Sequence, residues 1–108
     1  MTKIAILTAA LAMPALVLLS GAAQAADTAV GRHIARTLCS ECHQVGPASP
    51  QPPNSTAPRF PDIARMPSTT ELSIKVFLRS SHPHMPNIML SPAQMDAVAA
   101  YILSLAKH

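Results

Sequence analysis

Two cysteines and a histidine lie close together in the stretch Cys39-Ser40-Glu41-Cys42-His43. Two thiols separated by two residues can each form a thioether with one of the two vinyl groups of a haem, and the next residue then lies under the iron. A neutral imidazole nitrogen of His43 is a suitable proximal ligand. The motif therefore predicts one covalently bound haem c, attached through Cys39 and Cys42 and ligated by His43.

The thiol pair has three other interpretations: a disulfide, a thioredoxin-like redox motif, or half of a zinc site. A redox disulfide is expected within a βαβ pattern, and the sequence shows no alternating strand pattern. A structural zinc site usually needs a second pair of ligands, and Cys39 and Cys42 are the only cysteines. Haem attachment is the stronger hypothesis.

The second axial position of the iron decides the function. A methionine there closes the iron and raises its potential, as in an electron carrier, whereas an open position permits gas binding or catalysis. We predict Met85, because Pro86 stiffens the backbone after it and Asn87 can donate a hydrogen bond to its sulfur. Met89 is the alternative, although a methionine near the start of a helix more often packs in the core.

Two histidines beside these methionines leave a third hypothesis. His82 and His84, with Met85 and Met89, resemble a soft copper site, since imidazole and thioether suit copper. A copper protein would leave the Cys-x-x-Cys-His motif without a role, so this hypothesis ranks below both haem proteins. The blander interpretation is that His82 stops a helix and that His84 is a surface residue.

The first 25 residues have the pattern of a cleavable signal peptide. Lys3 precedes an apolar run from Ile4 to Ser20, and Ala23-Gln24-Ala25 is a processing site. We expect residues 26–108 to form one small exported domain in the periplasm, without stable membrane insertion after cleavage. The net charge of +3 is too small to indicate a nucleic-acid partner.

Helical patterns flank the candidate ligands. We expect helices over about 29–38, over 62–65 as a single turn, over 72–80 after a capping box that begins at Ser68, and over 92–105 after the cap Ser91-Pro92-Ala93-Gln94. Residues 44–67 are rich in proline and must form an ordered loop. The domain is predicted to be all-α, and with three aromatic residues it needs something besides side chains to fill its core.

In this order of motifs the chain resembles the bacterial class I, single-haem cytochromes c. The resemblance rests on Gly31, Ala35 and Cys39 at intervals of four, on the attachment motif, on Ala57-Pro58-Arg59-Phe60, on the segment His82–Asn87, and on the closing helix from Leu90. It implies three to four short helices around one haem, connected by long Pro-rich loops. The chain has no tryptophan and its loop before Pro58 matches nothing in the family, so the propionate partner stays open among Arg59, Arg65, Ser55 and Thr56.

The resemblance also implies roles for single residues. Pro58 would accept a hydrogen bond from the second nitrogen of His43, Phe60 and Val98 would pack on the porphyrin, and Gly31 would let the first helix cross the last near Tyr101. The implied activity is one-electron transfer without substrate turnover, so the protein would not be an enzyme. Its partners would be redox proteins, a dehydrogenase or reductase as donor and an oxidase or other acceptor, and it would be a monomer or a subunit of a redox complex.

Overall fold

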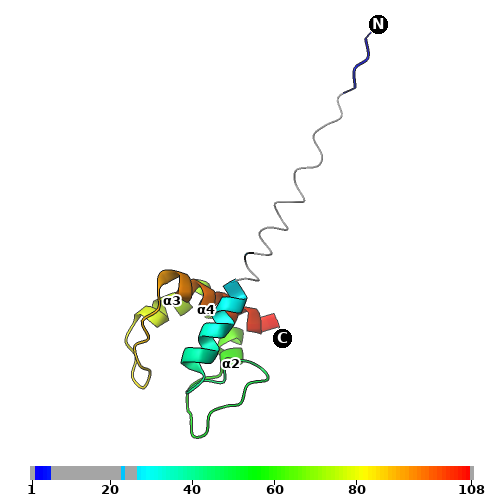
Figure 1. The fold of residues 1–108 in the computed structure, drawn as a ribbon. Coiled ribbons are helices and arrows are strands. Elements are labelled where there is room, and N and C mark those ends of the chain that lie inside the picture. Colours follow the sequence, from blue (N-terminus) through cyan, green and yellow to red (C-terminus); the bar gives the residue numbers. More distant parts are fainter. Residues whose placement is uncertain (1, 6–22, 24–26, 108) are drawn as a thin grey trace.

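The computed structural model describes residues 2–5, 23 and 27–107, and its folded part consists of helices joined by loops (Figure 1). Residues 27–34 are α-helical and continue into a π-helical turn, η1 (Ala35–Cys39). After it come α2 (Phe60–Arg65), α3 (Glu71–Arg79), α4 (Pro92–Ser104) and a final 3₁₀ turn, η2 (Leu105–Lys107). No strand occurs among the described residues, whose sole β feature is an isolated bridge between His82 and Met85. The prediction of an all-α domain is confirmed.

Most of the predicted signal peptide, residues 1, 6–22 and 24–26, lies outside the described residues. Within the described part of the chain, no helix combines the length and the apolar character needed to cross a membrane. The boundary at residue 25 therefore stays a prediction.

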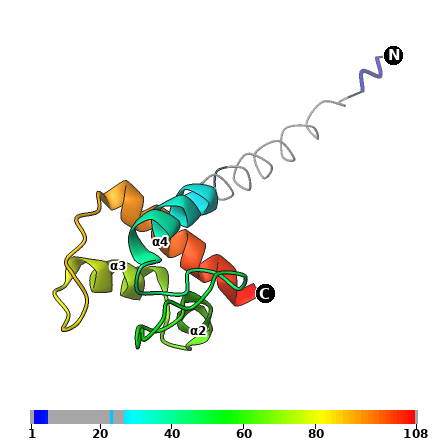
Figure 2. The ribbon, with the colours of Figure 1, turned by 60° about the horizontal axis from the view of Figure 1, so that its bottom comes forward.

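The first helix crosses α4, as the two views of the ribbon show (Figures 1 and 2), and Gly31 lies at the contact. A Cβ atom on Gly31 would lie 1.9 Å from the carbonyl oxygen of Ala97 and 2.8 Å from Cβ of Tyr101. Only glycine permits two helix backbones to come this close. The predicted crossing is present, and it fixes the helix that leads into Cys39 against the last helix of the chain.

Helix α4 begins where the sequence pattern places it. Ser91 Oγ accepts a hydrogen bond from Gln94 N, and Gln94 Oε1 accepts one from Ser91 N, with Pro92 at the first helical position. This reciprocal capping box satisfies two of the four backbone donors that a helix start leaves unpaired. The helix then supplies much of the core through Met95, Ala97, Val98, Ala99, Tyr101 and Ile102.

The N-cap of helix α3 lies two residues later than predicted, although the helix itself begins at Glu71, one residue before the predicted start. Thr70, and not Ser68, is the N-cap, and its partner in the capping box is Ser73. Each residue of the run Ser68-Thr69-Thr70 is able to cap a helix. A contact outside the run decides between them: Thr69 Oγ1 donates to Ile63 O at 2.6 Å, so Thr70 is left to cap the helix. Lys75 then joins α3 to α4 by an ion pair with Asp96 at 2.5 Å.

Only part of the apolar surface of α3 is buried. Ile74 is buried and Leu78 packs partly against the core, whereas Leu72 is 70% exposed and Val76 and Phe77 are about half exposed. One apolar face of α3 therefore packs against the core, and no other part of the described chain covers its second apolar face.

The proline-rich segment forms an ordered loop that ends in α2. Phe60 and Ala64 of this helix are buried, and Ile63 packs against the core, but Met66 is half exposed and does not join them. At the start of the loop, Val45 is buried and its carbonyl oxygen accepts a 2.7 Å hydrogen bond from the Tyr101 hydroxyl. The loop is thus fixed to the helices at both ends.

Candidate haem-binding site

The attachment motif follows directly on the π-helical turn η1. The backbone N–H groups of Cys42 and His43 both donate to Cys39 O, at 3.2 and 2.9 Å. The attachment motif itself therefore forms one further turn after η1. Such π-turns are uncommon and often occur at functional sites. This one ends on Cys39 itself and so sets the direction in which that side chain leaves the helix.

The two thiols have different surroundings. Cys39 is half-buried against the core, and burial raises the pKa of its thiol to about 11. The Cys42 thiol is exposed. Neither sulfur is in a disulfide, so both are available for thioether bonds. Because Cys39 stays protonated at neutral pH, its reaction with a vinyl group must include loss of the thiol proton.

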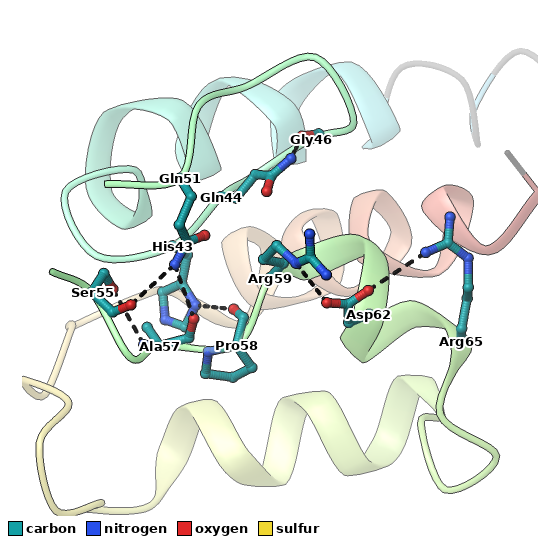
Figure 3. A network of polar contacts seen from close by, with 10 residues as sticks. All are labelled: His43, Gln44, Gly46, Gln51, Ser55, Ala57, Pro58, Arg59, Asp62 and Arg65. Atoms are coloured by element: carbon teal, nitrogen blue, oxygen red, sulfur yellow. Dashed lines mark hydrogen bonds and ion pairs between the residues drawn. The ribbon is translucent and has the colours of Figure 1, made fainter. Parts of the chain in front are cut away.

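His43 is oriented by a carbonyl on the opposite side of the loop. Its Nδ1 lies 2.7 Å from Pro58 O (Figure 3). A carbonyl oxygen can only accept, so the proton is on Nδ1 and the lone pair is on Nε2, the form that binds a metal. The ring of the buried Phe60 lies 5.1 Å from the imidazole, centroid to centroid, and restricts its rotation.

Two of the four candidate propionate partners, Arg59 and Arg65, form ion pairs with the carboxylate of Asp62. Arg59 Nε lies 2.7 Å from Asp62 Oδ2, and Arg65 lies 3.7 Å from Asp62 Oδ1, with all three side chains about half exposed. Arg59 and Thr56 line a surface cavity together with Ser55, whereas Arg65 lies outside it. The structure therefore brings Arg59, Ser55 and Thr56 together and separates Arg65 from them.

The two candidate distal methionines differ in burial. Met85 is half-buried and lines a small cavity with Phe77, Leu78 and Ile88. Met89 is 93% exposed and lines no part of it. Asn87 Nδ2 donates to Ser81 Oγ at 3.4 Å, and no bond joins it to Met85 within the described residues. The geometry favours Met85 over Met89, while the part assigned to Asn87 stays a prediction.

The histidines of the same loop are placed differently from each other. His82 stacks on Phe77 with 3.5 Å between ring centroids, and its Nε2 donates to Phe77 O at 2.9 Å. His84 is exposed and has a φ of 68°. Nε2 of His82 is already in a hydrogen bond, and Met89, another of the four candidate copper ligands, is 93% exposed. The copper hypothesis stays a prediction.

These residues fit a covalently attached haem. Two free thiols and an imidazole with the correct tautomer could supply the attachment and one ligand, and the half-buried Met85 is a candidate for the other. Apolar side chains that protein leaves half exposed, Leu38 of η1 and Val76 and Phe77 of α3, suit the flat apolar surface of a porphyrin. Phe60 and Val98, predicted to pack on that surface, are both buried in the core.

Sequence reasoning missed two residues of this site. The side chain of Gln51 donates to the backbone carbonyls of Ser55 and Ala57, and the Ser55 hydroxyl donates to Cys42 O and accepts from Ala57 N. These bonds hold the loop between His43 and Pro58. Ser55 was considered only as a propionate partner, and Gln51 not at all. No local pattern marks them, because their partners are carbonyl groups that only the folded loop brings within reach.

An all-α fold with a Cys-x-x-Cys-His motif and a carbonyl-bonded histidine defines the class of c-type haem proteins. The sequence model of the cytochrome c family matches residues 28–106, and the chain belongs to that family. It is 35% identical to a cytochrome c-552 of Bradyrhizobium diazoefficiens over 86 residues, which are 80% of this chain and 82% of that protein. The comparison with solved structures gave no significant match.

Membership of the family settles several of the expectations from sequence. The chain is a bacterial cytochrome c of class I, its cofactor is covalently bound haem c, and its fold is the small all-α fold of that class. Cytochromes c are typically electron carriers that work with redox partners.

Proposed function

We propose that the protein is an exported one-electron carrier in which Cys39 and Cys42 hold the haem while His43 and Met85 ligate its iron. The observation that carries the proposal is the 2.7 Å contact between His43 Nδ1 and Pro58 O, which leaves the lone pair of Nε2 free to bind a metal. The half-buried Met85 supports methionine as the second ligand. The bound haem supplies an iron that alternates between the ferrous and ferric states.

The chain's own residues fit a carrier better than a catalyst. Pro58 keeps His43 in one tautomer and one orientation, so the ligand set need not change when the charge on the iron changes. Pro86 limits the freedom of the backbone next to Met85. A ligand pair held on both sides leaves no coordination position for a substrate, which is why we propose electron transfer without turnover.

The optical spectrum tests the ligands. We expect the ferric protein to show the weak far-red band of methionine-ligated haem and the ferrous protein to bind carbon monoxide poorly. Met85→Ala should remove the band and permit carbon monoxide binding, whereas the matched variant Met89→Ala should keep the wild-type spectrum. A band that survives in Met85→Ala and disappears in Met89→Ala would transfer the ligand to Met89. Its absence from the wild type would favour a gas-binding or catalytic haem protein instead.

Attachment and export are tested separately. Mass spectrometry of the mature protein should show one haem added to a chain that begins at Ala26, and the double variant Cys39→Ser/Cys42→Ser should lose its haem under denaturing conditions. Recovery from the periplasmic fraction supports export, and recovery of the haem-loaded protein from the cytoplasmic fraction would contradict it. An intact residue 1 would contradict cleavage after Ala25. We propose a dehydrogenase or reductase as donor and an oxidase or other acceptor as the recipient of the electron.

A further inference from the structure

The carbonyl group of Pro58 lies in a loop that the main chain alone holds weakly. Residues 44–59 contain no helix and no strand, and the prolines at 47, 50, 52, 53 and 58 have no N–H group to donate. Two backbone hydrogen bonds within the loop are local turns, from Ser49 N to Gly46 O and from Ser55 N to Pro52 O. A third, from Phe60 N to Gln44 O at 2.9 Å, joins the two ends of the loop but leaves residues 47–58 without a main-chain bond to the attachment motif. Side chains must supply the contacts between that stretch and the motif.

The hydroxyl group of Ser55 connects the two sides of this loop. Its Oγ–H donates to the carbonyl oxygen of Cys42, inside the attachment motif, and the same oxygen accepts from Ala57 N at 3.2 Å. A hydroxyl group has one donor and two acceptor positions, so Ser55 can make both bonds at once. It thereby links the backbone just before His43 to the backbone just before Pro58. Figure 3 shows the bond between Ser55 and Ala57.

Gln51 braces the same segment from the other side of the loop. Its Nε2 lies 3.4 Å from Ser55 O and 3.4 Å from Ala57 O, so one amide group spans the two carbonyls that precede Pro58. At this length both bonds are weaker than those of Ser55. Gln51 therefore supports the geometry that the Ser55 hydroxyl sets.

We propose that Ser55 is a positioning residue for the proximal ligand. By fixing Pro58 O against Nδ1–H of His43, it keeps that hydrogen bond short and makes the imidazole a stronger donor to the iron, which stabilises the ferric state. This role rests on the proposed function, because it requires His43 to be a ligand. Ser55 acts through the loop and needs no contact with the haem.

The decisive comparison uses three serine variants of the haem-loaded protein. Ser55→Ala should raise the reduction potential above that of the wild type, and NMR should show solvent exchange of the His43 Nδ1 proton accelerated by about tenfold, the factor expected for losing support worth one hydrogen bond. Ser55→Thr keeps the hydroxyl and should restore both values toward wild type. Ser49→Ala, in the same loop but without a side-chain bond in this network, should change neither.

Gln51→Ala provides a second measurement that does not depend on the yield of Ser55→Ala. Because its two bonds are longer, it should move potential and exchange rate in the same direction by a smaller amount. A wild-type potential and exchange rate in both Ser55→Ala and Gln51→Ala would overturn the role of Ser55 while leaving His43 as the ligand. If the spectrum of the wild-type protein showed no histidine ligation of the iron, the proposed function would be refuted, and the role of Ser55 with it.

Discussion

Replacing Gly31 by alanine tests the helix crossing on which the whole domain depends. The added Cβ would meet Ala97 O at 1.9 Å, while real Cβ contacts essentially never fall below 3.0 Å, so the two backbones would have to separate by about 1 Å. The obstructing atoms are main chain, and no rotamer change can relieve them. We therefore place the packing cost at the upper end of the usual range, about 3 kcal/mol.

Alanine also improves helix propensity, by roughly 1 kcal/mol over glycine. The net loss for Gly31→Ala is then about 2 kcal/mol, a large fraction of the roughly 5–15 kcal/mol that stabilises a typical domain. In urea unfolding of the haem-loaded protein, followed by circular dichroism, the midpoint should fall by about 1–2 M.

The control for this experiment is the neighbouring residue. Val30 lies in the same helix and is 51% exposed, so Val30→Ala should change the midpoint little. The double variant Gly31→Ala/Ala97→Gly should not recover stability, because the Ala97 atoms nearest to the added methyl group are its backbone carbonyl carbon and oxygen. A midpoint for Gly31→Ala at or above the wild-type value would show that helix propensity dominates and that the close approach has been misjudged.

Three further perturbations concern the contacts around α4. Tyr101→Phe leaves the buried carbonyl oxygen of Val45 unpaired and should cost about 1–3 kcal/mol in thermal unfolding, and an unchanged Tm would mean that water replaces the hydroxyl. Ser91→Ala removes a helix cap and should cost about 1 kcal/mol, with Ser91→Thr recovering most of it. The hydrogen bond to Asp96 is the main reason why the pKa of Lys75 is raised above 10.5, so this contact should stabilise the protein below pH 10.5 and cease to do so as the pH rises through the raised pKa. The stability difference between wild type and Asp96→Asn should therefore shrink in strong alkali, and a difference that is constant across that range would contradict the assignment.

How far the sequence alone could predict this fold depends on whether the deciding contact is local. The cap of α4 was predictable because Ser91 and Gln94 satisfy each other within one turn. The start of α3 was not predictable from the sequence pattern. The Thr69 hydroxyl donates to Ile63 O, which lies outside that pattern, and Thr70 is the N-cap instead. The π-helical form of residues 35–39 has no sequence signal at all.

The candidate site divides in the same way. The attachment motif is local, and Cys39, Cys42 and His43 could be proposed from spacing alone. The acceptor for His43 came from the resemblance of the segment around Pro58 to a known family. The bonds of Ser55 could come from neither source, because no motif covers that loop and the partner of Ser55, the carbonyl of Cys42, is a backbone group that every residue possesses.

The crossing at Gly31 has a consequence for how the chain acquires its structure. It joins the first helix of the domain to the last, and Tyr101 reaches back across 56 residues to Val45. Contacts between such distant parts of a chain form slowly, because the intervening loop must first be closed. A growing chain that has not yet made Ala97 and Tyr101 lacks the surface on which its first helix rests. Assembly of this domain must therefore wait for its final helix, and the thiols of Cys39 and Cys42 remain on an open, accessible chain until then.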